Sequence, residues 1–357
     1  MVLKRLFQIV WLFGLMGLTQ VSIAQHSAKP KRVVFLIGDG MGLTQISAAM
    51  SQYNGQNAFM RFPFVGLSKT SSAKQYITDS GAGATAFSIG KKTYNNAIGV
   101  DADTVPQPTL FEMAKNKNLS TGVVATVSIQ HATPASFYAH VKHRKMYDSI
   151  STFLLSGNCD IAIGGGANFI YNRADKKNLT DDLKAKGFGV FNDSVLVDVN
   201  ASKYIYTLAK DEIKPMIKGR GDFLTRASNQ AINNLSKNKN GYLLMVEGSQ
   251  IDWGGHENDY QYMKTELWDF NETINAILDI AAKDKDMLVI VTADHETGGL
   301  TLNESEDKLS FTPKFSTGDH TGVMVPVFAY GAGAQEFAGM YENTEIFNKI
   351  VKLLNLK

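Results

Sequence analysis

Short runs of apolar, often β-branched residues recur along the chain, and several are separated by segments with helical periodicity. The runs lie at residues 33–37, 121–127, 161–163, 241–246, 287–292 and 326–330. Residues 224–235 and 260–278 instead repeat apolar positions every three or four residues, which predicts amphipathic helices. Strands that alternate with helices predict an α/β fold with a largely parallel central sheet.

One charge-rich stretch, residues 173–186, carries a local helix signal of its own. Thr180 is followed by Asp181 and Asp182, and Gly187 stands where a helix would end. This pattern predicts a short surface helix with Thr180 at its N-terminal cap.

The first 24 residues have the pattern of a secretory signal peptide. Lys4 and Arg5 precede an apolar run that extends to about residue 21, and Ser22 and Ala24 follow with the small-x-small spacing of a cleavage site. The run is nearly long enough for a membrane anchor, but no charged cluster follows it directly. We therefore predict cleavage, export to the periplasm or the medium, and no membrane span after cleavage.

The remaining chain, residues 25–357, shows no internal repeat and no low-complexity linker, so we predict a single domain. The whole chain has a net charge of +2, and the predicted signal peptide carries two of its positive charges. A nearly neutral mature chain argues against nucleic acid as a specific partner. Cys159 is the only cysteine, so no intramolecular disulfide can form, and we interpret it as a small buried residue.

Three of the apolar runs end next to residues of the types that bind metal ions. Asp39 follows the first run, Glu247, Asp252 and His256 follow the fourth, and Asp294 and His295 follow the fifth. The carboxyl ends of parallel strands meet at one edge of a sheet, so these residues should converge. The sets Asp252/His256/His320 and Asp39/Asp294/His295 offer carboxylate and imidazole ligands, a mixture that suits zinc and leaves an open coordination position.

Two other functional motifs are incomplete. Residues 38–43 approach the glycine fingerprint of dinucleotide-binding proteins, but Leu43 stands at the third glycine position. Ser80 does not lie in the nucleophile elbow of an esterase, because Thr78 stands where that motif requires glycine.

Residues 78–90, TDSGAGATAFSIG, resemble the signature of the alkaline phosphatase family. The family's other blocks follow in order, at residues 37–42, at 132–135 with His140 and Arg144, at 246–248 with Asp252 and His256, at 292–295 and at 318–322. The similarity extends from about residue 33 to about residue 330. The resemblance implies a three-layer α/β/α fold and hydrolysis of small-molecule phosphate monoesters.

The resemblance also implies a role for each matching residue. Ser80 would be the nucleophile and form a covalent phosphoserine, and Arg144 would bind the phosphoryl group. The implied ligands are Asp252, His256 and His320 for one zinc, Asp39, Ser80, Asp294 and His295 for a second zinc, and Asp39, Thr133 and Glu247 for a magnesium. The family further suggests a homodimer that releases phosphate from organic esters.

The chain departs from well-studied members at two positions near these sites. His131 stands beside the third metal site where enterobacterial members have aspartate, so zinc or cobalt could replace magnesium there. Trp253 stands where relatives carry lysine or histidine near the substrate phosphate. In addition, only 24 residues separate His295 from His320, so the crown-like insertion of larger members is absent or minimal.

Two alternative functions can be compared with the sequence, and the second belongs to a different class. A phosphodiesterase or a sulfatase of the same superfamily is the nearest enzymatic alternative, but Ser80 lacks the Cys/Ser-x-Pro-x-Arg context of sulfatases, and diesterases generally use threonine and lack the arginine. A non-catalytic metal- or phosphate-binding protein would have lost Ser80 or a zinc ligand. This chain retains all of them.

Overall fold

The computed structural model describes residues 29–357, so the predicted signal peptide lies outside the described residues. A sheet of ten strands runs through the molecule. In spatial order the strands are β14 (Gly339–Glu342), β2 (Phe64–Lys69), β13 (Val325–Gly331), β8 (Met287–Thr292), β1 (Arg32–Gly38), β7 (Tyr242–Gly248), β3 (Ser120–Ser128), β4 (Ile161–Gly165), β6 (Tyr204–Thr207) and β5 (Gly189–Asn192). Only β13 is antiparallel to its neighbours, which confirms the largely parallel sheet.

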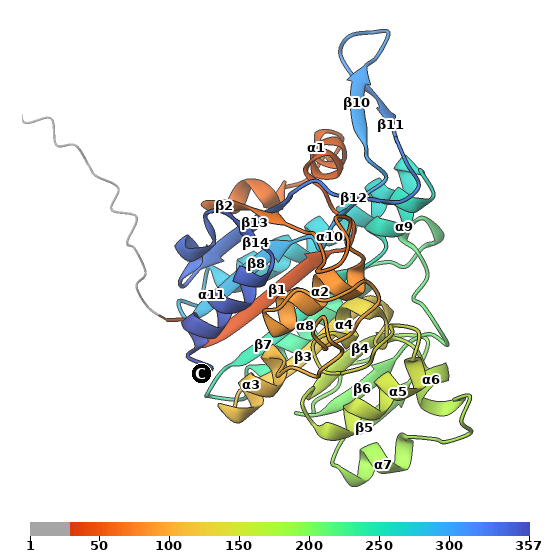
Figure 1. Cartoon of the computed structure of the whole chain (residues 1–357), viewed down its shortest axis with the longest axis vertical. Coiled ribbons are helices and arrows are strands. Elements are labelled where there is room, and N and C mark those ends of the chain that lie inside the picture. Colours follow the sequence, from red (N-terminus) through yellow and green to blue (C-terminus); the bar gives the residue numbers. More distant parts are fainter. Residues whose placement is uncertain (1–28) are drawn as a thin grey trace, which may run out of the picture.

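Helices cover both faces of the sheet (Figure 1). Alternate residues of β1 point into two separate cores: Val34 and Leu36 pack into one, and Phe35 packs into the other. The first core is closed by α1 (Leu43–Ser51), α8 (Phe223–Leu235) and α10 (Tyr260–Ala281). The second is closed by α2 (Ser80–Ile89), α3 (Leu110–Asn116), α5 (Tyr147–Thr152) and α11 (Thr344–Leu354). The three-layer α/β/α architecture is confirmed.

All six predicted apolar runs form strands, and both predicted amphipathic helices are present as α8 and α10. The sequence did not predict β2, β5, β6 and β14. Three of these have only four residues, and β2, β5 and β14 are only partly buried. Pairing with neighbouring strands, rather than a local apolar pattern, makes β2, β5 and β14 strands, whereas β6 is a fully buried run of strand-forming residues that was overlooked.

The predicted surface helix is present as α7 (Thr180–Ala185), but its cap was assigned to the wrong residue. The side-chain oxygen of Asn178 accepts a hydrogen bond from the N–H of Thr180 at 2.8 Å. Thr180 is therefore the first residue of the helix, and Asn178 satisfies its free N–H.

The segment between His295 and His320 forms β9 (Glu296–Thr297), β12 (His320–Thr321) and a hairpin of β10 (Thr301–Glu304) and β11 (Phe311–Lys314). The hairpin projects from the body of the molecule (Figure 1). Within residues 29–357, no helix is both long and apolar enough to span a bilayer. Cys159 is buried, as predicted.

Candidate metal centre and active site

The strands at the middle of the sheet deliver the candidate ligands to one edge. Asp39 directly follows β1, Glu247 is the penultimate residue of β7, and Asp294 and His295 follow β8 closely. Because β7 and β8 flank β1 on either side in parallel register, their carboxyl ends meet, as predicted.

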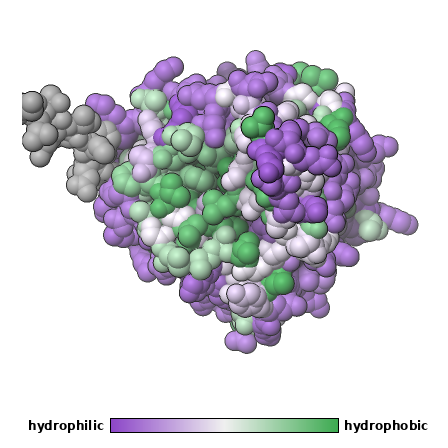
Figure 2. Space-filling model, turned by 90° about the horizontal axis from the view of Figure 1, so that it is seen from above, coloured by the Kyte–Doolittle hydropathy of each residue, from purple (hydrophilic) through white to green (hydrophobic). Residues whose placement is uncertain are grey.

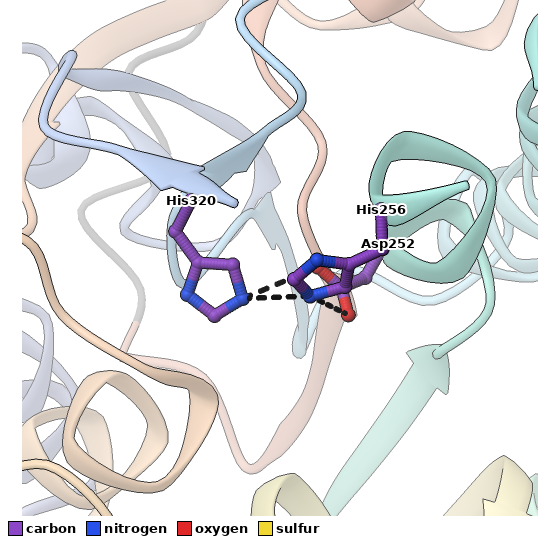
Figure 3. A group of neighbouring side chains, drawn as sticks. All are labelled: Asp252, His256 and His320. Carbon is purple, nitrogen blue, oxygen red and sulfur yellow. Dashed lines mark hydrogen bonds and ion pairs between the residues drawn. The ribbon is translucent and has the colours of Figure 1, made fainter. Parts of the chain in front are cut away.

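The first group of ligands comes from a helix and a short strand (Figure 3). Asp252 and His256 lie four residues apart on α9 (Ile251–His256) and therefore share one face. His256 Nε2 lies 3.1 Å from His320 Nε2 and 3.4 Å from Asp252 Oδ2. His320 Nε2 lies 3.5 Å from Asp252 Oδ1.

The opposite ring nitrogens of these two histidines face main-chain carbonyls. His256 Nδ1 lies 2.6 Å from the carbonyl oxygen of Gly318, and His320 Nδ1 lies 2.9 Å from that of Thr78. A carbonyl only accepts, so both Nδ1 atoms carry hydrogen and donate. Both Nε2 atoms therefore face each other and a carboxylate, so either a proton or a bound cation must lie among them; the hydrogen bond to Asp252 accordingly raises the pKa of His256 to about 9.

The second group joins the nucleophile candidate to the sheet edge. His295 Nε2 lies 3.4 Å from both Asp39 Oδ1 and Asp294 Oδ2. The Ser80 hydroxyl lies 3.2 Å from His295 Nε2 and 3.4 Å from Asp39 Oδ1. The rings of His295 and His320 stack with centroids 3.6 Å apart, so the two groups are contiguous.

A third group shares Asp39 with the second and adds Glu247 and His131. His131, which the sequence placed only beside this site, therefore offers a ring nitrogen to it directly. Thr133 was predicted to bind the third metal together with Asp39 and Glu247. It is fully buried in the short helix α4 (Ala132–Ala135).

Several polar atoms of the second and third groups are buried without a hydrogen-bond partner among the described residues. They are Asp39 Oδ2, Asp294 Oδ2, both carboxylate oxygens of Glu247, Thr133 Oγ1 and His131 Nδ1. Buried polar atoms without partners are costly and rare in folded proteins. Oxygen and nitrogen donors gathered in this way fit bound cations, so the residues present are suited to the metals that the family implies.

The electrostatics of the metal-free site lead to the same conclusion. Burial, together with neighbouring carboxylates, raises the pKa of Asp294 to about 7 and that of Asp39 well above its usual value. Burial is also the largest cause that raises the pKa of Glu247, to about 8. Burial holds the pKa of His295 well below its usual range, so this ring is neutral. Without bound cations, the ionised forms of these three carboxyl groups are therefore disfavoured, and a bound cation would stabilise them.

These shifts predict how the stability of the metal-free protein depends on pH. Folded-state pKa values of about 7 for Asp294 and about 8 for Glu247, against ordinary values of 3.8 and 4.5, mean that the folded chain holds protons that the unfolded chain releases. That stabilisation is lost as pH rises through the folded-state values. We expect chelated protein to become less stable as pH rises from about 4.5, near the ordinary pKa values, to about 8, near the folded-state values. Thermal melts across this range measure the loss, and Asp294→Asn, which removes one acid, should flatten the curve; a stability that rises with pH would contradict the prediction.

Ser80 is the first residue of α2, and the preceding Asp79 organises the surrounding loop. Asp79 Oδ1 accepts from the N–H groups of Ala82 and Asn96, both at 3.0 Å, and Oδ2 accepts from Arg144 at 3.0 Å. The Ser80 oxygen thus lies at the positive end of a ten-residue helix, which favours negative charge on it.

Arg144 contacts two residues of the site. One of its terminal nitrogens donates to Asp79, and the other lies 3.2 Å from His131 Nε2. Ser80, His131 and Trp253 line the same open cleft as Arg144. The half-buried indole of Trp253 is therefore placed where a substrate would enter.

Sequence reasoning assigned no role to two residues of the site. Asp79 stands directly before a helix, and the preference of aspartate for that position could have revealed its capping role. Thr297 contacts both Asp252 and His295. Its strand β9 has only two residues, so no periodicity could have revealed it.

Comparison with known proteins bears directly on this arrangement. The family model for alkaline phosphatase matches residues 30–313 and 306–356. The chain belongs to the alkaline phosphatase family. Alkaline phosphatase 3 of Bacillus subtilis is 34% identical, with 91% of this chain and 89% of the relative covered. This family membership makes the chain an enzyme that hydrolyses phosphate monoesters.

Solved structures of the family superpose closely on this fold. Alkaline phosphatase from the Antarctic bacterium TAB5 is 44% identical, covers 92% of this chain and 99% of its own, and has a TM-score of 0.89. A TAB5 variant with one histidine replaced by aspartate, of the same identity and coverage and with a TM-score of 0.87, has magnesium bound in one of its metal sites. The fold predicted from the resemblance is thereby confirmed.

Proposed function

We propose that this enzyme hydrolyses phosphate monoesters through a covalent phosphoserine at Ser80. The observation that supports this most strongly is the position of the Ser80 hydroxyl. It lies at the N-terminus of α2 and within 3.2–3.4 Å of His295 and Asp39. No other serine in the described residues combines a helix N-terminus with contact to a ligand group.

Arg144 orients the substrate in this proposal. Its planar guanidinium offers two parallel donors to two non-bridging phosphoryl oxygens, and Asp79 holds it in place from behind. The Ser80 oxygen then attacks phosphorus and gives up its proton, the bond between phosphorus and the alcohol oxygen breaks, and the alcohol takes up one proton in exchange as it leaves. Water attacks the phosphoserine from the vacated side, which releases inorganic phosphate and restores Ser80.

The ligand groups would hold two zinc ions and one further cation. One zinc would be bound by Asp252, His256 and His320. The other would be bound by Asp39, Asp294 and His295 together with Ser80. Asp39, Thr133 and Glu247, beside His131, would bind magnesium, zinc or cobalt. Bound cations supply positive charge that favours the deprotonated form of a hydroxyl or a water and offsets charge on phosphoryl oxygens.

His131→Asp should convert the third site to one that prefers magnesium. A carboxylate and its waters suit magnesium, whereas imidazole suits zinc better. A histidine-to-aspartate variant of the TAB5 enzyme does have magnesium bound in one of its metal sites, which fits this expectation. We expect added magnesium to raise the activity of the variant several-fold and to affect the wild type less. Superimposable activation curves would show that His131 does not control this site.

Trp253 supplies a neutral wall of the substrate cleft in this proposal. An indole offers one N–H donor and no charge. A cleft with tryptophan here would hold the phosphate product less tightly than one with lysine, which favours release of phosphate.

A second copy of the chain is the macromolecular partner that we propose. The face seen from above carries an exposed apolar area (Figure 2). Apolar side chains from α1, β14 and the segments that precede α2 and β13 line one groove: Leu43, Tyr76, Val323, Met324 and Met340. Tyr76 is 79% exposed and Met340 60%, unusual for large apolar side chains without a covering partner.

Charge placed in this groove should dissociate the dimer. We expect Met340→Lys to shift the mass measured by light scattering from dimer toward monomer. Val195→Lys is the matched control, because Val195 is 62% exposed but lies outside the groove. A wild-type chain that is monomeric at micromolar concentration, or a charged variant that stays dimeric, would contradict the proposed interface.

Comparison of ester classes tests the proposed function itself. We expect the purified enzyme to hydrolyse p-nitrophenyl phosphate far faster than bis-p-nitrophenyl phosphate or p-nitrophenyl sulfate. A preference for the diester or the sulfate would favour the superfamily alternatives. No hydrolysis by the metal-loaded protein would favour a binding protein.

The proposal also includes a location and a role for the enzyme. The segment 1–24 would direct its export, and the enzyme would release phosphate from organic esters outside the cytoplasm.

A further inference from the structure

Thr297 lies between the two candidate zinc sites and hydrogen-bonds to a ligand of each. Its hydroxyl donates to Asp252 Oδ1 and lies 3.2 Å from His295 Nδ1. Among residues 29–357, no other side chain from outside the two groups hydrogen-bonds to a residue of both.

The hydroxyl has one proton, which fixes the direction of both bonds. An ionised carboxylate only accepts, so the proton of Thr297 goes to Asp252. Toward His295 the same oxygen must then accept, and the donor is the N–H at Nδ1. A neutral imidazole with its hydrogen on Nδ1 has its lone pair on Nε2. Nε2 is the atom that faces Asp39, Asp294 and Ser80.

His295 differs in this respect from the other two histidines. His256 and His320 direct Nδ1 at main-chain carbonyls, which a side-chain substitution cannot remove. The orientation of His295 depends instead on a side chain that is itself bonded to the other site.

Packing holds Thr297 in one place. It is fully buried, pairs with His320 across β9 and β12, and donates its main-chain N–H to the carbonyl of Gly40 at 3.2 Å. The backbone of α9 approaches closely from the other side, because a Cβ on Gly255 would lie 2.9 Å from Thr297 Cβ. The hydroxyl therefore cannot turn away to another partner without displacing its neighbours.

We propose that Thr297 is a positioning residue that couples the two cation sites, by orienting Asp252 in one and fixing the tautomer of His295 in the other. The inference rests on the proposed two-zinc function. Removing the hydroxyl leaves the Nδ1–H of His295 buried without an acceptor, or moves the hydrogen to Nε2, where it blocks the ligand position. Asp252 loses a hydrogen bond at the same time.

Zinc binding by four proteins tests the coupling. Thr297→Val keeps the shape and removes the hydroxyl, and Thr297→Ser restores it. Thr273→Val is the matched control, because Thr273 is equally buried on α10 and bonds only to Thr225 and Asp269. Zinc affinity is measured by competition with a chelator of known affinity. Because loss of a ligand's supporting hydrogen bond typically costs about 10–100-fold in metal affinity, we expect Thr297→Val to weaken binding at least about 10-fold at the second site and several-fold at the first.

The controls separate coupling from a general loss of structure. Thr297→Ser should bind zinc within about threefold of the wild type, as should Thr273→Val, because both keep the supporting hydrogen bonds. Repeating Thr297→Val in a His256→Ala background, where the first site is incomplete, isolates the effect on the second. Unchanged affinities in Thr297→Val, a serine variant as weak as the valine variant, or a loss at one site only would overturn the proposal. A wild-type protein that binds fewer than two zinc ions would instead contradict the proposed function.

Discussion

Ser80→Ala should lower the rate of phosphate monoester hydrolysis by about three orders of magnitude or more, while the zinc content stays at the wild-type level. The expectation follows from the role of a covalent nucleophile: without it, only binding and electrostatic stabilisation remain to accelerate the reaction. Zinc should remain, because the variant keeps all three protein ligands of each triad, Asp252, His256 and His320 in one and Asp39, Asp294 and His295 in the other.

Ser88→Ala is the control for this variant. Ser88 is a fully buried serine on the same helix, and its hydroxyl makes no contact with a ligand group. Its substitution should leave turnover within about twofold of the wild type, as is usual for small changes remote from a site. Activity of the Ser80 variant above about a tenth of the wild-type rate would show that another group is the nucleophile.

Removal of the metals is the change with the second-largest expected effect. Exhaustive chelation should abolish activity and lower the melting temperature in parallel, because a cation that binds only the folded chain stabilises it by mass action. Each site contributes about 4 kcal/mol when the free metal is a thousandfold above its dissociation constant. At a few degrees per kcal/mol, two sites amount to about 10 °C or more.

Restoring zinc should recover both properties, which distinguishes metal loss from irreversible damage. Calorimetry and p-nitrophenyl phosphate turnover on the same samples, with metal content determined for each, provide the measurement. Full activity of protein shown to be free of zinc would refute the assignment of the ligand groups, and an unchanged melting temperature would show that the sites do not contribute to stability.

Much of this architecture could be predicted from local sequence patterns. The apolar runs of β1, β7 and β8 are buried on both faces, so their patterns are continuous and easy to recognise. The acids and histidines that follow them had to converge once these strands were parallel neighbours. The edge strands β5 and β14 lack such a pattern, since pairing with a neighbour defines them, whereas the buried run of β6 was short enough to be overlooked.

The supporting residues of the site were harder to predict than the candidate ligands. The role of Thr297 depends on β9 and β12 lying side by side, and 22 residues separate these strands. The hydrogen bond that Arg144 donates to Asp79 joins residues 65 positions apart in the sequence. No local pattern encodes such contacts, whereas the candidate ligands could be assigned through the family signature.

The most direct test of the central claim is to trap the phosphoenzyme. The enzyme is mixed with substrate labelled in the phosphoryl group, quenched in acid, and digested, and the labelled peptide is sequenced by mass spectrometry. Acid quenching preserves a phosphoserine ester and stops further turnover. With labelling carried out at low pH, we expect label on Ser80 and none on the Ser80→Ala variant; label on any other residue would contradict catalysis through Ser80.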